Sequence, residues 1–300
     1  MSHLAHESLG KTFEEAFEKT RAKIEQRGNL PYVTIARQLE LLEQLAQFEF
    51  GRSLILHQGR ITGYWAYYTI RHSFIPHPKA TPLERFILER SPTGKATTQR
   101  FRIMQTLLQK RLKEGILLAS IPCSSITTLL TLNFSKIKRF ELMGVDAELE
   151  STRYVQELAS QRGLESHIHC YEKDAWKTSL REVCDGIVSH GLNFYEPDDD
   201  KVLALYKQFY HTLKPGGFLL LSYLTPPPGV YHRSEWLMDK ISLEDALLQR
   251  ILFIDILNAC WSAFRTTEQT RQQLAEAGFS HIETFPDEAR ILPVALASKS

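Results

Sequence analysis

Residues 116–125 read ILLASIPCSS, and this stretch decides the fold. The apolar run from Ile116 to Ile121 is short and has no polar face, as expected of a strand that is buried on both sides of a sheet. The loop that follows contains no glycine, the residue that usually lets a backbone approach a nucleotide closely, although its small side chains still leave room. The stretch therefore predicts the first strand of a parallel α/β sheet, followed by a ligand-facing loop.

The chain beyond this stretch alternates between strand-like and helical segments. Apolar runs predict strands at residues 140–145, 167–171, 186–189 and 218–223, a helix at 199–212 and a KPGG turn at 214–217. Strands that alternate with helices indicate βαβ units and a parallel sheet. The last part differs, because a helix at 267–276 is followed by two strand-like runs at 282–285 and 291–297.

Asp146 directly follows the second apolar run and lies 23 positions after Cys123. In a Rossmann unit, an acidic residue about 20 positions beyond the first turn binds the two ribose hydroxyls of the ligand. Asp also caps helices well, and the two roles are compatible. We interpret Asp146 as the ribose-binding carboxylate.

The loops after the third and fourth strands should face the same ligand, because ligands bind beyond the carboxyl ends of parallel strands. Asp174 could accept a hydrogen bond from an adenine amino group while Trp176 covers the ring; the alternative is a surface carboxylate and a half-buried indole. The next loop contains His190, Tyr195 and Glu196. A histidine at this strand end either contacts the transferred group or simply packs.

The first hundred residues predict helices. Thr12 and Glu15 form a T-x-x-E capping box, and Pro31 suits the first turn of a second helix. Another helix is expected at about 97–113. Tyr64 and Tyr68 are four residues apart, so in a helix both would face one side, either toward a cleft or into a core.

Composition restricts the classes of partner and compartment. The 300 residues include 36 basic and 35 acidic side chains, so no basic field would attract nucleic acid. The four cysteines form no C-x-x-C pair, which suits a reducing compartment, and no His, Cys or carboxylate cluster has metal-site spacing. The N-terminus has no signal-peptide core, and the longest apolar runs are far shorter than a membrane span. We therefore expect a cytoplasmic protein with no membrane partner and no metal.

In this order, the segments resemble class I S-adenosylmethionine-dependent methyltransferases. LKPGGF at 213–218, directly before and into a strand, is typical of that family. The chain is also similar, over nearly its whole length, to an uncharacterised bacterial subgroup of the family. The segments that carry this similarity are SIPCS at 120–124, DAW at 174–176, HGLNFYEPDD at 190–199, LTPPP at 224–228 and GYWAYY at 63–68. Two departures from the subgroup's motifs are Ser124 in place of glycine and His190 in place of asparagine.

The resemblance implies a Rossmann-like α/β fold with a seven-stranded, mostly parallel sheet whose last strand is antiparallel. It implies methyl transfer from S-adenosylmethionine, with S-adenosylhomocysteine as product, to a small-molecule acceptor. The expected cofactor contacts are Ser120, Pro122, Cys123, Asp146, Ala147, Asp174, Ala175, Trp176 and His190.

Methyl transfer from a sulfonium needs mainly alignment, and a general base only when the acceptor carries a proton at attack. Glu196 and His190 are the candidates for such a base. On the acceptor side, we expect Tyr64, Tyr68 and Tyr195 to line the site, since aromatic side chains suit an apolar acceptor.

We expect an N-terminal helical segment over 1–110 and a methyltransferase domain over 111–300, with 224–265 as a helical insertion above the active site. The competing hypothesis is a degenerate fold that binds the cofactor or a protein without catalysis, which the glycine-free loop favours. A nicotinamide dehydrogenase would need a G-x-G-x-x-G segment that is absent. A cytosine-C5 methyltransferase would carry its Pro-Cys pair after the fourth strand, whereas Pro122-Cys123 follows the first.

Overall fold

The computed structural model describes residues 12–61, 63–74, 77–123, 126–147, 149–229, 234–259 and 263–300. The chain divides into two compact units. The helical unit comprises 1–61, 68–95 and 238–262, and the sheet unit comprises 62–67, 96–237 and 263–300. The expected division into 1–110 and 111–300, with 224–265 as an insertion, stays a prediction.

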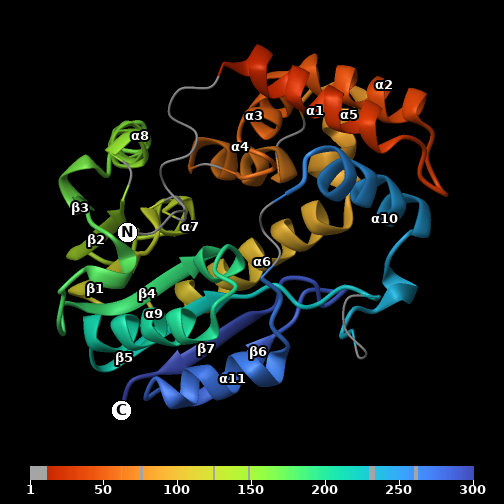
Figure 1. The fold of residues 1–300 in the computed structure, drawn as a ribbon. Coiled ribbons are helices and arrows are strands. Elements are labelled where there is room, and N and C mark those ends of the chain that lie inside the picture. The colour runs from red at the N-terminus through yellow and green to blue at the C-terminus, as the bar shows by residue number, and fades with distance from the viewer. Residues whose placement is uncertain are drawn as a thin grey trace. The chain divides into compact units, whose positions relative to one another are not determined.

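The sheet unit contains one seven-stranded sheet in the order β3-β2-β1-β4-β5-β7-β6 (Figure 1). Its strands are β1 (Ile116–Ser120), β2 (Phe140–Asp146), β3 (Ile168–Glu172), β4 (Cys184–His190), β5 (Leu213–Ser222), β6 (Ser280–Phe285) and β7 (Val294–Ser298). The pairs among β1 to β5 are parallel, whereas β7 is antiparallel to both β5 and β6. The expected mostly parallel sheet with an antiparallel last strand is confirmed.

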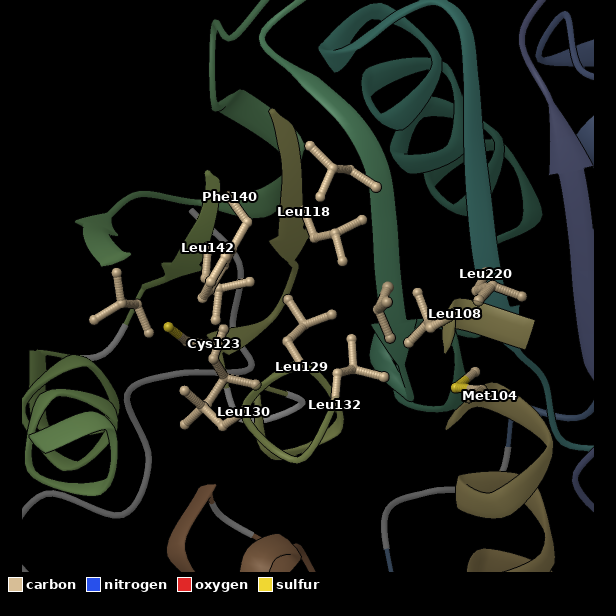
Figure 2. Packing of buried hydrophobic residues seen from close by; sticks show 14 of the residues in the cluster. Met104, Leu108, Leu118, Cys123, Leu129, Leu130, Leu132, Phe140, Leu142 and Leu220 are labelled. Atoms are coloured by element: carbon tan, nitrogen blue, oxygen red, sulfur yellow. The ribbon is translucent and has the colours of Figure 1, made fainter. Parts of the chain in front are cut away.

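Alternate residues along the strands supply two buried clusters, as a sheet covered on both faces requires. Leu118, Leu142 and Leu220 belong to the first cluster, which also includes Met104 and Leu108 of α6 (Figure 2). The neighbouring residues Ala119, Met143, Leu219 and Leu221 belong to the second cluster, which includes Leu205 of α9 and Leu274 of α11. The helices of this unit are α6 (Pro92–Gln109, which begins in the helical unit), α7 (Thr127–Leu130), α8 (Leu149–Ser160), α9 (Asp199–Thr212) and α11 (Thr267–Glu276).

The expected turn at 214–217 is wrong, because β5 already begins at Leu213 and runs through it. The pairing of β4 with β5 shifts register between Cys184 and Gly186, and Gly216 has a φ of 74°. The Pro-Gly-Gly segment therefore forms an irregularity within β5, and the strand does not begin after it.

The helical unit contains α1 (Phe13–Arg27), α2 (Ile35–Ala46), α3 (Glu49–Leu56), α4 (Gly63–Phe74, which begins in the sheet unit), α5 (Pro82–Arg85), a π-helical turn (Phe86–Arg90), α10 (Leu243–Arg250) and a second π-helical turn (Ile251–Ile256). The capping box of Thr12 and Glu15 at the start of α1 is confirmed. The expectation for Pro31 is wrong: α2 begins at Ile35, since Thr34 caps it and the Leu30–Val33 bridge closes the turn that holds Pro31.

Residues 238–262 join the helical unit through side-chain contacts of α10. Asp245 forms an ion pair with Arg90 at 2.6 Å, and Gln249 accepts hydrogen bonds from the backbone and side chain of Thr93. None of the helices in the described ranges is long and apolar enough to cross a membrane.

Candidate active site at the carboxyl edge of the sheet

The carboxyl ends of the parallel strands bring most of the predicted site residues to one edge of the sheet. Ser120 ends β1 and Asp146 ends β2, where its Cα pairs with that of Glu172 at the end of β3. On the other side of β1, His190 ends β4 and pairs with Ser222 at the end of β5. Because neighbouring strands are ~4.8 Å apart, this edge can present several side chains to one ligand.

The loop after β1 is held by its own contacts. The Ser120 hydroxyl donates to the carbonyl of Pro122 at 2.8 Å, and the Ile121–Pro122 peptide bond is cis. The side chains of Ser120 and Cys123 are fully buried, whereas Pro122 is half-buried. Ser120 thus shapes the loop, and direct cofactor contacts from these three residues stay predictions. Ser124, the departure from the glycine of the motif, lies outside the described residues.

Cys123 is packed above a glycine of β2. A Cβ atom on Gly144 would overlap Cys123 Sγ and would lie 3.4 Å from Cys170 Sγ of β3. The hydrogen bond between the two thiols, followed by burial, raises the pKa of Cys123 above its usual value. A thiol that stays protonated is a poor nucleophile, so the buried Cys123 is suited to packing and not to covalent catalysis.

Asp146 is half-buried, and its main-chain carbonyl accepts a hydrogen bond from Lys173 N at 2.7 Å. This bond ties the end of β2 to the loop after β3. Its carboxylate is close enough to the Cys123 and Cys170 thiols to raise the pKa of Cys123 further. Ala147, the next residue, is exposed. Asp146 therefore lies at the carboxyl end of β2, and its contact with a ribose stays a prediction.

The Asp174 and Trp176 side chains both make structural contacts. Asp174 Oδ1 accepts a hydrogen bond from Trp176 N at 2.9 Å and caps the short turn Ala175–Lys177. Trp176 is half-buried, and its indole N–H donates to the carbonyl of Lys201 on α9 at 2.8 Å. Ala175 is buried. The indole is thus held by α9, and the adenine contacts of Asp174 and Trp176 stay predictions.

His190 lies at the end of β4, and only one of its two ring nitrogens has a hydrogen-bond partner among the described residues. Its Nε2 is 3.1 Å from the Thr128 hydroxyl on α7, while its Nδ1 is closed from solvent and has no partner among the described residues. Burial, and then the charge of Arg100, lower the pKa of His190 well below its ordinary value of 6.5. The imidazole is therefore neutral at pH 7, suited to hydrogen bonding and a weak base.

Glu196, the other candidate base, is buried and engaged. Its carboxylate accepts a hydrogen bond from Asp198 N at 3.0 Å and forms an ion pair with Lys201 at 3.7 Å. These contacts favour a role in holding the loop, and general-base catalysis by Glu196 stays a prediction.

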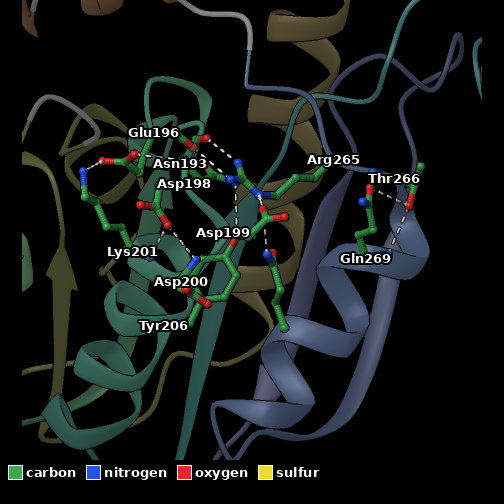
Figure 3. A network of polar contacts seen from close by, with 11 residues as sticks. Asn193, Glu196, Asp198, Asp199, Asp200, Lys201, Tyr206, Arg265, Thr266 and Gln269 are labelled. Carbon is green, nitrogen blue, oxygen red and sulfur yellow. Dashed lines mark hydrogen bonds and ion pairs between the residues drawn. The ribbon is translucent and has the colours of Figure 1, made fainter. Parts of the chain in front are cut away.

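Arg265 fixes the loop between β4 and α9 from the other side (Figure 3). The guanidinium, 3% exposed, donates to the carbonyls of Asn193 and Glu196 at 2.9 and 2.8 Å and to Asp199 Oδ1 at 2.8 Å. The Nε and both terminal nitrogens each donate one of these bonds, so the whole guanidinium group is used. This residue, which the sequence reasoning did not select, gives the HGLNFYEP segment its shape.

The three tyrosines expected on the acceptor side occupy different places. Tyr64 is 47% exposed, with its ring edge-on to Trp65. The Tyr68 hydroxyl donates to Glu84 Oε1 at 2.5 Å within the helical unit. Tyr195 is half-buried in the sheet unit, near Arg100. Tyr64 and Tyr68 thus belong to different compact units, and their acceptor contacts stay predictions.

The sequence reasoning also missed Arg100 of α6. Its side chain is 9% exposed and donates to the Ser222 hydroxyl at 3.4 Å. Burial lowers the pKa of Arg100 to about 10. One signal was present: Arg100 precedes Met104 by four residues and Leu107 by seven, so it is a charge on the apolar face of its helix.

Comparison with solved structures identifies the fold. The carbon methyltransferase CurJ has a TM-score of 0.55 at 14% identity, covering 97% of this chain and 84% of that one. The S-adenosylmethionine-dependent methyltransferase SibL, in its apo form, has a TM-score of 0.52 at 14% identity, covering 95% and 96%. Together with the strand order, these matches show the class I methyltransferase, Rossmann-like fold.

A protein from Bordetella parapertussis, described as a possible exported protein, is far more similar. It shares 38% identity and a TM-score of 0.91 over 96% of this chain and 95% of its own. No protein-family model and no curated protein matches the sequence. The chain therefore belongs to the same family as this possible exported protein of Bordetella parapertussis.

Proposed function

We propose that the protein is an S-adenosylmethionine-dependent methyltransferase that acts on a small-molecule acceptor. The observation that carries the proposal is the position of Asp146, half-buried at the end of β2 and beside the loop after β1 in a class I fold. A carboxylate at this point has two oxygens for the two hydroxyls of a ribose. The buried Nδ1 of His190, which lacks a partner among the described residues, also leaves a polar group for a ligand at this edge of the sheet.

When bound, S-adenosylmethionine supplies a methyl group that is already activated on a sulfonium. The protein's part is then to bind and to orient. Asp146 would hold the ribose, and Asp174 would hold the adenine. Ser120 and Cys123, at the loop after β1, would contact the cofactor. His190, neutral at pH 7, would orient a polar group near the reacting centre without adding a positive charge there. Arg265 binds two main-chain carbonyls of the loop that follows His190.

Calorimetric titration with S-adenosylmethionine and S-adenosylhomocysteine tests the proposal. We expect micromolar binding of both, about 8 kcal/mol. The Asp146→Ala variant should lose about 1.5–3 kcal/mol of cofactor affinity, as expected for hydrogen bonds to a charged group.

The matched control is Glu141→Ala, which removes an exposed carboxylate elsewhere on β2. It should bind both ligands like the wild type. Equal affinity of a folded Asp146→Ala variant would refute the ribose assignment. A folded wild type that binds neither ligand would instead favour the degenerate fold that acts through protein contacts.

The compartment and partners are part of the same proposal. We expect a cytoplasmic enzyme without nucleic-acid, membrane or metal partners, whereas the similar Bordetella protein is described as possibly destined for export. Fractionation of cells that express the full chain at native level separates the two locations. Recovery in the periplasmic or secreted fraction would overturn the cytoplasmic prediction.

A further inference from the structure

Arg100 carries a buried charge that the described residues do not neutralise. Its side chain is 9% exposed, and in the described part of the chain no carboxylate lies within the 4.0 Å of an ion pair. The single hydrogen bond to Ser222 Oγ is long at 3.4 Å, and the Arg100 Nε is closed from solvent without a partner. A buried guanidinium in this state is strongly unfavourable unless something pairs with it.

The charged and titratable groups around Arg100 are engaged elsewhere or neutral. Asp287 favours the charged form of Arg100, but its carboxylate already accepts hydrogen bonds from the backbone of Ala289, Ile291 and Leu292. Tyr195 also favours the charged form, and His190 on β4 is neutral at pH 7. Burial still dominates and lowers the pKa of Arg100 to about 10, so the side chain remains a cation at neutral pH.

A second unpartnered atom lies on the same face of the sheet. Ser222, which Arg100 contacts, and His190 are Cα partners on the adjacent strands β5 and β4, so their side chains point to the same face. If the Thr128 hydroxyl donates to His190 Nε2, the proton of the neutral ring is on Nδ1, which is the buried atom without a partner. Arg100 and His190 thus offer unused N–H donors from neighbouring positions.

The order of the strands separates this place from the expected cofactor residues. Asp146 and Asp174 follow β2 and β3, which lie on one side of β1 and β4. Arg100 contacts the end of β5, on the opposite side of β4. His190 ends β4, between the two groups. A ligand group at Arg100 would therefore belong to the molecule that meets the cofactor at His190 and not to the ribose or the adenine.

We propose that Arg100 binds a carboxylate of the methyl acceptor, with His190 Nδ1–H as an additional donor. This inference rests on the proposed function. A planar carboxylate matches the guanidinium fork, and one negative charge balances the one unpaired cation. The enzyme would accordingly select anionic acceptors over their neutral amides or esters.

Thermal unfolding in the presence of S-adenosylhomocysteine tests the site with minimal probes, sodium formate and sodium acetate, compared with sodium chloride at equal ionic strength. The wild type should gain several degrees in Tm with the carboxylates relative to chloride, and acetamide should have no effect. Arg100→Met should be more stable than the wild type without carboxylate, because the unpaired charge is gone. Its apparent formate affinity should fall at least tenfold.

Arg102→Met is the matched control, since Arg102 lies on the same helix and is exposed. It should respond to formate like the wild type. Arg100→Lys, which keeps the charge and removes the fork, should respond more weakly than the wild type. The Arg100→Lys variant also tests the inference if Arg100→Met fails to fold. A wild type without a carboxylate-specific response, or an Arg100 variant with the full response, would overturn the inference.

Calorimetry with S-adenosylhomocysteine separates this inference from the proposed function. Arg100→Met should bind the product with wild-type affinity. If it loses that affinity, Arg100 serves the carboxylate of the cofactor, and the assignment to the acceptor is wrong. If the wild type itself does not bind the product, the proposed function fails, whatever the response to formate.

Discussion

Gly144 of β2 shows how tightly single residues determine the site. An added Cβ atom there would overlap Cys123 Sγ, and both residues lie next to the strand end that carries Asp146. We expect Gly144→Ala to lower the free energy of unfolding by about 1–3 kcal/mol, the usual cost of overpacking a dense core. Urea denaturation measures this loss directly.

Cys123→Ala, combined with Gly144→Ala, tests whether the Cys123 thiol is the group that the new Cβ atom meets. The Cys123 Cβ would lie 3.6 Å from the new Cβ atom of residue 144, an ordinary contact, so the clash involves the sulfur alone. The double variant should recover much of the stability that Gly144→Ala loses, giving a coupling free energy of about 1 kcal/mol or more. Simple additivity of the two substitutions would show that the thiol is not the obstacle.

At the scale of an element, α11 depends on its first turn. The Thr266 hydroxyl accepts a hydrogen bond from Gln269 N at 3.1 Å, and the Gln269 side chain accepts one from Thr266 N at 2.9 Å. Thr266→Ala should therefore lower the free energy of unfolding by about 0.5–2 kcal/mol. Gln272→Ala, an exposed change within the same helix, should cost only a few tenths of a kcal/mol. Equal losses in the two variants would mean that the cap contributes nothing.

The elements differ in how far the sequence determines them. The bounds of α9 and α11 were predictable, as was the presence of all seven strands, because buried strands and capped helices leave local patterns. The start of β5 at Leu213 was not, because the Pro-Gly-Gly segment inside it resembles a turn. The start of α2 was predicted wrongly from Pro31, because a proline that suits the first turn of a helix also suits the turn before a helix. The Arg100–Ser222 and Trp176–Lys201 hydrogen bonds join residues of different elements that are far apart in the sequence, and no local pattern encodes them. For the candidate site, strand ends indicated Asp146 and His190, whereas Arg100 needed the tertiary structure.

For the whole molecule, His190 makes stability depend on pH. Its pKa in the folded protein lies well below 6.5, its ordinary value, because of burial and the charge of Arg100. The unfolded chain therefore binds a proton first as pH falls, so this contribution to stability is complete above pH 6.5. It decreases by about 1.4 kcal/mol per pH unit from there down to the folded pKa.

His190→Asn isolates this contribution from the other titrating groups. The stability difference between wild type and variant, measured by urea denaturation from pH 8 to pH 5, should be constant above about pH 6.5 and shift against the wild type below it. Parallel curves over the whole range would mean that the imidazole titrates normally in the folded protein. Arg102→Met should follow the wild-type curve, because Arg102 is exposed and is not among the groups that shift the pKa of His190.

The position of β7 has a consequence for the order of events during synthesis. This strand, Val294–Ser298, pairs with both β5 and β6, although it is made after them. On the ribosome, the side of β5 that pairs with β7 therefore stays without its partner until β7 emerges. A nascent chain in that state displays the open edge Phe218–Ser222, which has four apolar residues followed by a serine and leaves its backbone groups unpaired. Chaperone contact during translation is accordingly expected to concentrate on β5, and to end when β7 closes the sheet.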